Sequence, residues 1–266
     1  MDACKLEQLQ VRIFSQGRLL EQRLFEHYLG RASVQSCFRA LLAYQNDDGG
    51  FGAGIEPDLL TPESTGIGAE TALYYCDVLG WREETMLTQV TQWVRKAVGN
   101  GLVIPHPPQN MRLYPHQPWW DSPDANRILS VAGLLRLLGA DDPALFVRTD
   151  QLAESLLLPA ELTFYDYPAL IYAVYAPELP RRDEIIGHYV ERLPRFLEKN
   201  SDHFPLFGRY WYHAQPLVDP AILARERTRV LAAFGDSGTL PNPYPTLPWW
   251  ETMFTLDALM ILRMTE

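Results

Sequence analysis

The feature that most constrains this fold is a glycine-rich loop between two helical patterns, within residues 37–79. Apolar residues before the loop recur at helical spacing from Val34 to Leu42 and predict an amphipathic helix. The glycines at the end of residues 46–50 permit the left-handed backbone that ends a helix. Phe51 lies between two glycines and is expected to anchor the loop, and Ser64 or Thr65 is expected to cap the next helix.

The same residues resemble the QW-type repeat of the terpenoid cyclase and protein prenyltransferase superfamily. The shared pattern is an aromatic residue, a glutamine, a short polar spacer and Gly-Gly-Phe-Gly, which runs here from Tyr44 to Gly52. The continuation Glu56-Pro57-Asp58 is similar to a mostly uncharacterised bacterial branch of the superfamily. The resemblance implies an all-α fold, an α/α toroid with inner helices around a central cavity and outer helices behind them. The alternative is that residues 45–52 form only a well-made loop between two helices.

Of the two best-known motifs of that superfamily, Asp-x-Asp-Asp does not occur in this sequence, and Asp-x-Cys occurs once, as Asp2-Ala3-Cys4. Prenyltransferases bind zinc through Asp-x-Cys and a later His, and protonating cyclases use Asp-x-Asp-Asp. The His residues do not pair with Cys or with one another at zinc spacing. The sequence also lacks a P-loop, a dinucleotide fingerprint and a Gly-x-Ser-x-Gly motif. We therefore expect no metal site and no cofactor.

Charge and cysteine usage narrow the classes of partner. A net charge of -10 disfavours nucleic acid and anionic membrane surfaces, because both require a basic face. No stretch approaches the roughly 18 apolar residues of a membrane-spanning helix, so we expect no membrane insertion. Cys4, Cys37 and Cys76 are expected to be buried free thiols, and with an N-terminus that lacks a signal core they predict a cytoplasmic protein.

The remainder of the chain is predicted to form further helices joined by loops rich in proline. No segment shows the sustained alternation of a strand, and residues 1–266 are predicted to form a single α/α-toroid domain. Apolar spacing and capping signals predict helices over approximately the ranges 5–29, 83–98, 122–138, 142–158, 165–176, 181–199, 222–234 and 249–264.

A short motif recurs where several of these helices are expected to begin. Pro118-Trp119-Trp120-Asp121 is repeated as Pro248-Trp249-Trp250-Glu251, and Tyr165-Asp166-Tyr167-Pro168 is a looser copy. Helical repeats bury their faces by stacking on neighbours, and in a closed ring these openings would face one mouth. Their aromatic rings would then supply flat apolar faces, and Asp121, Asp124, Asp166 and Glu251 would supply carboxylates. The alternative is that the Trp pairs pack the loops and the acids cap helices.

Further acidic residues follow the glycine-rich loop. Glu56 and Asp58 flank the rigid Pro57, and the pair fits a general acid and base, a cation site, or a solvated turn. Glu70 lies among small and apolar residues, where a charge is costly unless it is paired. The predicted catalytic residues are Asp58, Glu70 and Asp121. The predicted substrate-binding residues are Glu56, Tyr74, Trp119, Trp120, Tyr165, Asp166, Tyr167, Trp249, Trp250 and Glu251.

Together these features predict a small-molecule ligand, either an isoprenoid or a saccharide. The resemblance implies a terpenoid cyclase-like or prenyltransferase-like protein with an isoprenoid-type ligand in an aromatic cavity and acid-initiated chemistry. Aromatic faces suit hydrocarbon chains and developing carbocations. A carbohydrate-active hydrolase or lyase on an (α/α) barrel is the first alternative, because tryptophan platforms and paired carboxylates also suit sugars. A non-catalytic binding scaffold is the second.

Overall fold

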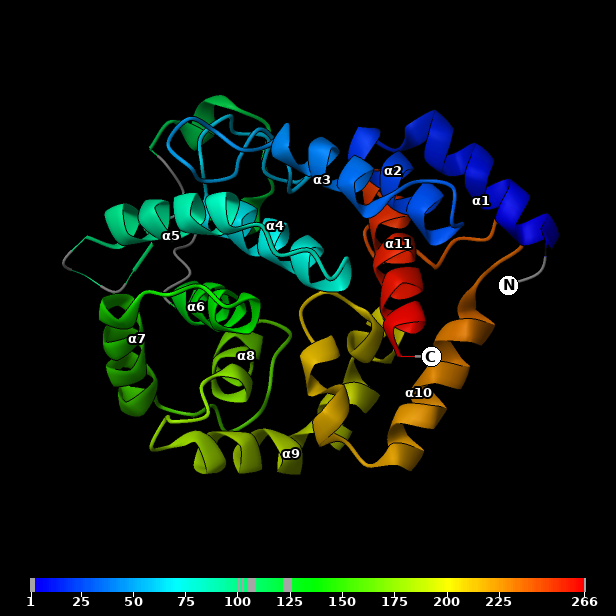
Figure 1. The fold of residues 1–266 in the computed structure, drawn as a ribbon. Helices are drawn as coiled ribbons and strands as arrows, with labels where there is room; N and C mark the ends of the chain where they lie inside the picture. Colours follow the sequence, from blue (N-terminus) through cyan, green and yellow to red (C-terminus); the bar gives the residue numbers. More distant parts are fainter. Residues whose placement is uncertain (1–2, 100, 102, 105–108, 122–125, 266) are drawn as a thin grey trace. The chain divides into compact units, whose positions relative to one another are not determined.

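The computed structural model describes residues 3–99, 101, 103–104, 109–121 and 126–265. Regular structure within these ranges is helical, and the strand-like pairings there are isolated bridges, Gln45 with Phe51 and Leu59 with His116. The prediction of an all-α chain is therefore confirmed. The chain divides into two compact units (Figure 1): a central unit, Ala43–Arg192, and a terminal unit, Met1–Leu42 with Leu193–Glu266. The prediction of a single toroid domain stays a prediction.

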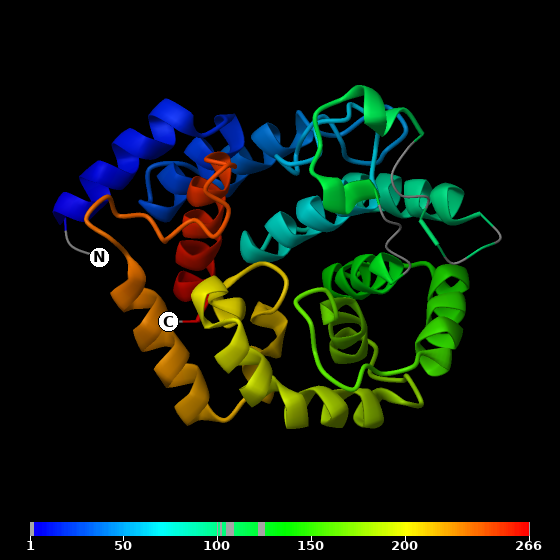
Figure 2. The same cartoon turned by 180° about the vertical axis from the view of Figure 1, so that it is seen from behind.

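The central unit is organised around one buried helix. Its elements are α4 (Gly66–Val78), α5 (Glu84–Val98), η1 (Gln109–Leu113), η2 (Pro118–Asp121), α6 (Arg127–Leu138), α7 (Pro143–Ser155), α8 (Tyr167–Tyr175) and the first part of α9 (Arg182–Lys199). In Figures 1 and 2, α6 lies beside α4 and α8, and it also contacts α5 and α7. Nearly every residue of α6 and α8 is buried, as expected for helices that are apolar on all sides.

The terminal unit joins the two ends of the chain. Its elements are α1 (Ala3–Gln16), α2 (Leu19–Tyr28), α3 (Val34–Leu42), the end of α9, η3 (Ser201–His203), η4 (Pro205–Phe207), η5 (Tyr212–Leu217), α10 (Pro220–Ala233) and α11 (Trp249–Met264). Helix α2 packs against α1, α3 and α11. Lys5 donates a hydrogen bond to the carbonyl of Phe234 at 2.7 Å. A buried ion pair, Arg209 Nε to Asp257 Oδ2 at 2.7 Å, ties α11 to the segment between η4 and η5.

The predicted opening helix over residues 5–29 was wrong, because the chain breaks it into α1 and α2. At Gly17 an added Cβ would lie 2.6 Å from the carbonyl oxygen of Ile13, so the close turn there requires glycine. The next helix then starts afresh from Arg18, whose backbone N–H donates to Glu21 Oε2 at 2.7 Å. That contact satisfies one of the donors left open at a helix start.

The predicted state of the cysteines is correct for two of the three residues. Cys37 and Cys76 are buried and free, whereas Cys4 is free but exposed, which corrects the prediction of a buried thiol. Burial raises the pKa of the Cys37 thiol to about 11 and that of Cys76 to about 12, so both stay protonated at neutral pH.

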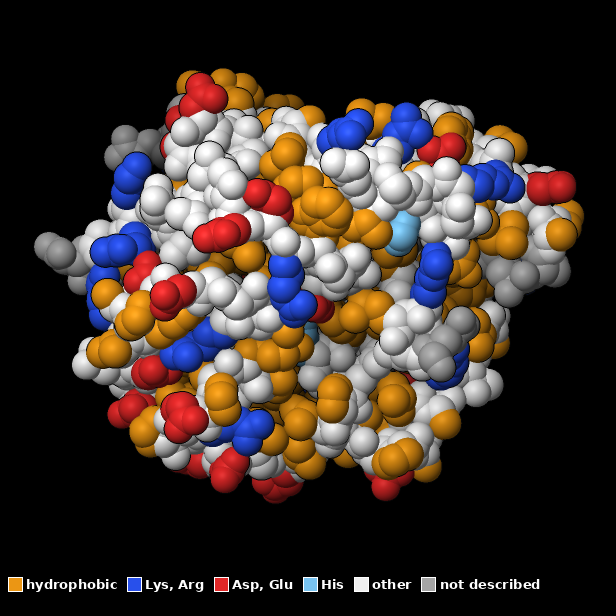
Figure 3. Space-filling model, in the orientation of Figure 1, with side chains coloured by type: hydrophobic (Ala, Val, Ile, Leu, Met, Phe, Trp, Pro, Cys, Tyr) orange, Lys and Arg blue, Asp and Glu red, His pale blue; other side chains and the backbone are white. Residues whose placement is uncertain are grey.

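Two observations concern the hydropathy of the described helices and the charge on the surface. Within the described ranges, no helix is both long enough and apolar enough to cross a membrane. Among the side chains coloured in Figure 3, those of Lys and Arg are interspersed with those of Asp and Glu rather than gathered on that face.

Candidate functional site

The glycine-rich loop, residues 44–52, uses its polar side chains to hold its own backbone. Asp48 Oδ1 accepts hydrogen bonds from the N–H of Gly50 at 2.9 Å and from the hydroxyl of Ser64 at 2.7 Å. The amide of Gln45 donates to the carbonyl of Gly49, and Phe51 is fully buried as expected. These contacts favour the structural interpretation of the loop, in which it fixes where the chain after it begins.

That following chain places Asp58 against both tryptophans of the first Pro-Trp-Trp motif. Trp119 Nε1 donates to Asp58 Oδ2 at 3.1 Å, and Trp120 Nε1 donates to Asp58 Oδ1 at 2.9 Å. Two backbone hydrogen bonds hold the segments together, from Leu60 N to Pro115 O and from Gln117 N to Asp58 O, each at 3.0 Å. Asp58 is only 3 % exposed, so it does not solvate a turn.

Glu56, the other acid beside Pro57, is also buried. It is 2 % exposed, and its Oε2 accepts a hydrogen bond from the hydroxyl of Thr71 in α4 at 3.0 Å. The interpretation of Glu56 and Asp58 as groups that merely solvate a turn was therefore wrong. The loop instead carries both carboxylates into the central unit, where a carboxylate must be compensated by hydrogen bonds or charge.

Glu70 in α4 forms the core of a second buried network. Its Oε2 accepts from Arg127 Nη1 at 2.8 Å and from the hydroxyl of Ser130 at 2.6 Å, and its Oε1 accepts from the hydroxyl of Tyr167 at 2.8 Å. Arg127 Nη1 also donates to Tyr167 Oη at 2.8 Å. Glu70 is therefore paired with a basic residue, and the network joins α4, α6 and α8.

Arg127 connects the two groups of residues. Its guanidinium carbon lies 5.8 Å from the centroid of the Trp120 ring, within cation–π range, while its Nη1 holds Glu70. Tyr165 belongs to the same neighbourhood. The pKa of Tyr165 is raised, first by partial desolvation of its phenol and then by the negative charge of Asp58, while Arg127 lowers it. Tyr165 is 64 % exposed and Trp119 is 38 % exposed, whereas Trp120 and Tyr167 are buried.

Other predicted site residues in the central unit lie apart from these contacts. Asp121 is about half exposed and lies 3.6 Å from His116, at the surface. Asp166 Oδ2 accepts from the backbone N–H and hydroxyl of Thr163, so its carboxylate closes the turn before α8. Tyr74 is 2 % exposed and packs on the ring of Tyr75 at 5.2 Å. Asp124 lies outside the described residues.

The second Pro-Trp-Trp motif belongs to the terminal unit. Trp249 is 37 % exposed, while Trp250 is 5 % exposed and stacks on Phe254 with ring centroids 5.0 Å apart. Glu251 forms an ion pair with Arg12 at 3.1 Å. The predicted common mouth for the two motifs stays a prediction. Their local structures differ, since Trp249 starts α11, whereas Trp119 and Trp120 lie in η2 and α6 starts only at Arg127.

Sequence reasoning missed Arg127, Ser130 and Thr71, which complete the networks around the acids. The signal for Arg127 was present, because it is a basic residue at the start of a helix whose next residues, Ile128 and Leu129, are apolar. A charge beside such a buried stripe requires a compensating group. The identity of that group was hidden, because Glu70 lies far from Arg127 along the chain.

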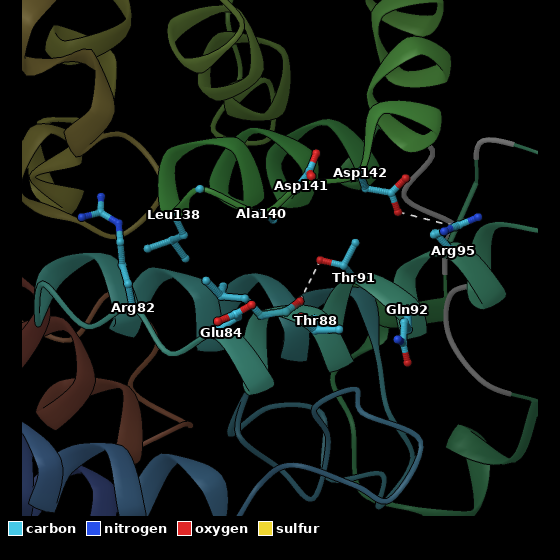
Figure 4. A pocket seen from close by; sticks show the side chains of 12 residues that line it. Arg82, Glu84, Thr88, Thr91, Gln92, Arg95, Leu138, Ala140, Asp141 and Asp142 are labelled. Atoms are coloured by element: carbon cyan, nitrogen blue, oxygen red, sulfur yellow. Dashed lines mark hydrogen bonds and ion pairs between the residues drawn. The ribbon is translucent and has the colours of Figure 1, made fainter.

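The central unit also contains a polar groove between α5 and the turn from α6 to α7 (Figure 4). Its volume is about 440 Å³, and its lining includes Arg82, Thr88, Gln92, Arg95 and Asp142. The Arg95–Asp142 ion pair, at 3.5 Å, spans one end of it. The groove contains no aromatic side chain, so it differs in character from the site around Asp58.

The comparisons with other proteins assign no family. No family model, no curated protein and no solved structure matches the chain. Within the described ranges, no group of three or more His, Cys, Asp or Glu side chains is arranged to hold a metal ion. The chemistry of the site must therefore be argued from its own residues: buried carboxylates, a paired arginine and partly exposed aromatic rings.

Proposed function

We propose that the central unit binds an isoprenoid-type ligand on the aromatic surface of Trp119 and Tyr165, beside the buried carboxylates. In this proposal the protein is terpenoid cyclase-like or prenyltransferase-like and cytoplasmic, and its helices form the α/α toroid that the glycine-rich loop suggests. The observation that supports it best is the pair of indole N–H groups bound to Asp58, which holds two large apolar rings against a carboxylate.

The charge balance of the site favours a ligand without a diphosphate. Glu56, Asp58 and Glu70 are each at most 3 % exposed, and Arg127 is a basic residue that contacts Glu70. Arg127 already donates to Glu70 at 2.8 Å, so an added diphosphate would meet more negative than positive charge. Aromatic faces with carboxylates behind them suit an alcohol or hydrocarbon, and they stabilise positive charge that develops on it.

The contacts also suggest roles for the acids. Asp58 and Glu70 each accept hydrogen bonds on both oxygens, an arrangement that favours a carboxylate as a fixed negative charge. We therefore assign them to electrostatic stabilisation. Glu56 accepts a hydrogen bond from the neutral hydroxyl of Thr71, and it is the acid we assign to proton transfer in any acid-initiated step.

Ligand-induced shifts in melting temperature test the proposal. Farnesol is expected to raise the Tm of the wild-type protein, and cellotetraose is expected to leave it unchanged. Trp119→Ala should abolish most of the farnesol shift, because it removes an exposed ring of the proposed surface. Leu157→Ala is the matched control, since Leu157 is 95 % exposed in the same unit. A shift with cellotetraose alone would favour the carbohydrate-active alternative, and no shift with either probe would favour the scaffold.

A further inference from the structure

Tryptophan has one polar atom, the indole Nε1, which acts only as a hydrogen-bond donor. In Trp119 and in Trp120 that donor is already used, at 3.1 Å and 2.9 Å from the two oxygens of Asp58. Trp119 nevertheless keeps 38 % of its surface exposed. The indole N–H of Trp119 is therefore already bonded within the protein, although the residue is partly exposed.

We propose that Asp58 is a specificity-determining positioning residue, which binds both indole N–H groups and thereby makes the surface selective for an apolar ligand over a saccharide. This inference rests on the proposed function for its ligand class. The two indole N–H donors are already used on Asp58, so they are not available to the hydroxyl groups of a saccharide. Asp58 acts through the two rings, because it is only 3 % exposed and accepts hydrogen bonds from their N–H groups.

The rings are held from more than one side, which makes the arrangement preorganised. The backbone hydrogen bond from Gln117 N to Asp58 O fixes the start of η2, and the guanidinium of Arg127 lies over the Trp120 ring at 5.8 Å. Asp58 accepts a hydrogen bond from each of the two indoles. Loss of its carboxylate should leave the fold of the segment in place while it releases the orientation of the rings.

The first measurement needs no ligand. Indole N–H resonances are recorded for the wild type and for Asp58→Asn, and Trp119→Phe and Trp120→Phe assign the two signals of interest. An amide offers only one acceptor atom and no charge, so both signals should move upfield in Asp58→Asn. Asp47→Asn is the control, because Asp47 is an exposed carboxylate in the glycine-rich loop and the charge change is the same. Unchanged Trp119 and Trp120 signals in Asp58→Asn would overturn the inference.

The second measurement is the affinity for farnesol and for cellotetraose. Asp58→Asn should lower the affinity for farnesol about tenfold, through lost preorganisation of the rings, and narrow the preference for farnesol over cellotetraose. Equal farnesol affinity in the wild type and Asp58→Asn overturns this inference alone. Absence of farnesol binding by the wild type overturns the proposed function, and the selectivity assigned to Asp58 with it. The indole resonances test the contact between Asp58 and the two rings without a ligand, so failure of the proposed function can be distinguished from failure of the role assigned to Asp58.

Discussion

At the scale of single residues, the ion pair between Glu70 and Arg127 makes the sharpest stability prediction. Both side chains are nearly inaccessible, and removal of one leaves the other charge buried without compensation. Glu70→Ala should therefore lower the free energy of unfolding by about 3–5 kcal/mol. The double variant Glu70→Ala/Arg127→Met should lose clearly less than the sum of the single changes, as measured by urea unfolding. If the stability losses of the two single variants simply add in the double variant, Glu70 and Arg127 do not interact as a buried pair.

The titration of Tyr165 makes a second prediction at this scale. The negative charge of Asp58 helps to raise the pKa of Tyr165, since it opposes the phenolate. Asp58→Asn should therefore move this pKa down towards its ordinary value, and the phenolate should form at a lower pH than in the wild type. The measurement is the phenolate absorbance, with Tyr165→Phe to isolate its contribution. An unchanged pKa would show that the charge of Asp58 does not act on this phenol.

The residues of the site were only partly predictable from the sequence. Glu56, Asp58 and Glu70 were singled out because carboxylates among glycine, proline and apolar residues require a special environment. Their contacts were not predictable, because Trp120 and Arg127 reach them from distant parts of the chain through tertiary packing. Asp166 was also misjudged. It follows aromatic residues as Asp121 and Glu251 do, but its carboxylate accepts a local hydrogen bond from the backbone N–H of Thr163.

At the scale of elements, the contact between the glycine-rich loop and α4 depends on one glycine. A Cβ added at Gly68 would lie 2.1 Å from the carbonyl oxygen of Phe51, closer than any two such atoms approach. Gly68→Ala must therefore push the loop off the helix and should cost about 1–3 kcal/mol or more in the free energy of unfolding. The measurement is chemical denaturation.

A second glycine in a helix provides the matched control for that change. At Gly187, which is exposed in α9, an added Cβ meets nothing within 4 Å. Gly187→Ala should stabilise the protein by about 0.5–1 kcal/mol, because alanine loses less backbone freedom in a helix. A loss of stability in Gly68→Ala together with a gain in Gly187→Ala would support the close contact between the loop and α4. Equal changes in the free energy of unfolding would contradict it.

Helix positions were more predictable than their contacts, for a physical reason. The start of α11 at Trp249 and the cap of α4 by Thr65 follow from local signals, namely a preceding proline and a hydroxyl that accepts from Gly68 N at 2.9 Å. The break at Gly17 was missed because the apolar spacing continues across it. The spacing of apolar residues shows which side of a helix is buried. It does not reveal a break in the helix when the same side remains buried on both sides of the break.

At the scale of the whole molecule, the division into units predicts independent folding of one of them. The central unit is continuous from Ala43 to Arg192 and contains its own buried helix, α6. A fragment of residues 43–192 should therefore show a helical circular dichroism spectrum and a cooperative melt. The separate fragment 1–42 should remain unfolded, because α2 packs on α11 of the terminal unit. A fragment 43–192 without a cooperative transition would contradict the division.

The discontinuity of the terminal unit has a consequence during protein synthesis. Leu9, Ile13, Leu20, Leu24 and Phe25 are all fully buried in that unit, where α11 covers part of the surface of α1 and α2. Translation proceeds at about 5–20 residues per second, so these helices wait on the order of ten seconds after leaving the ribosome before α11 exists. During that interval their apolar faces are open to chaperones, and these helices become fully buried only after the later-made α11 has formed.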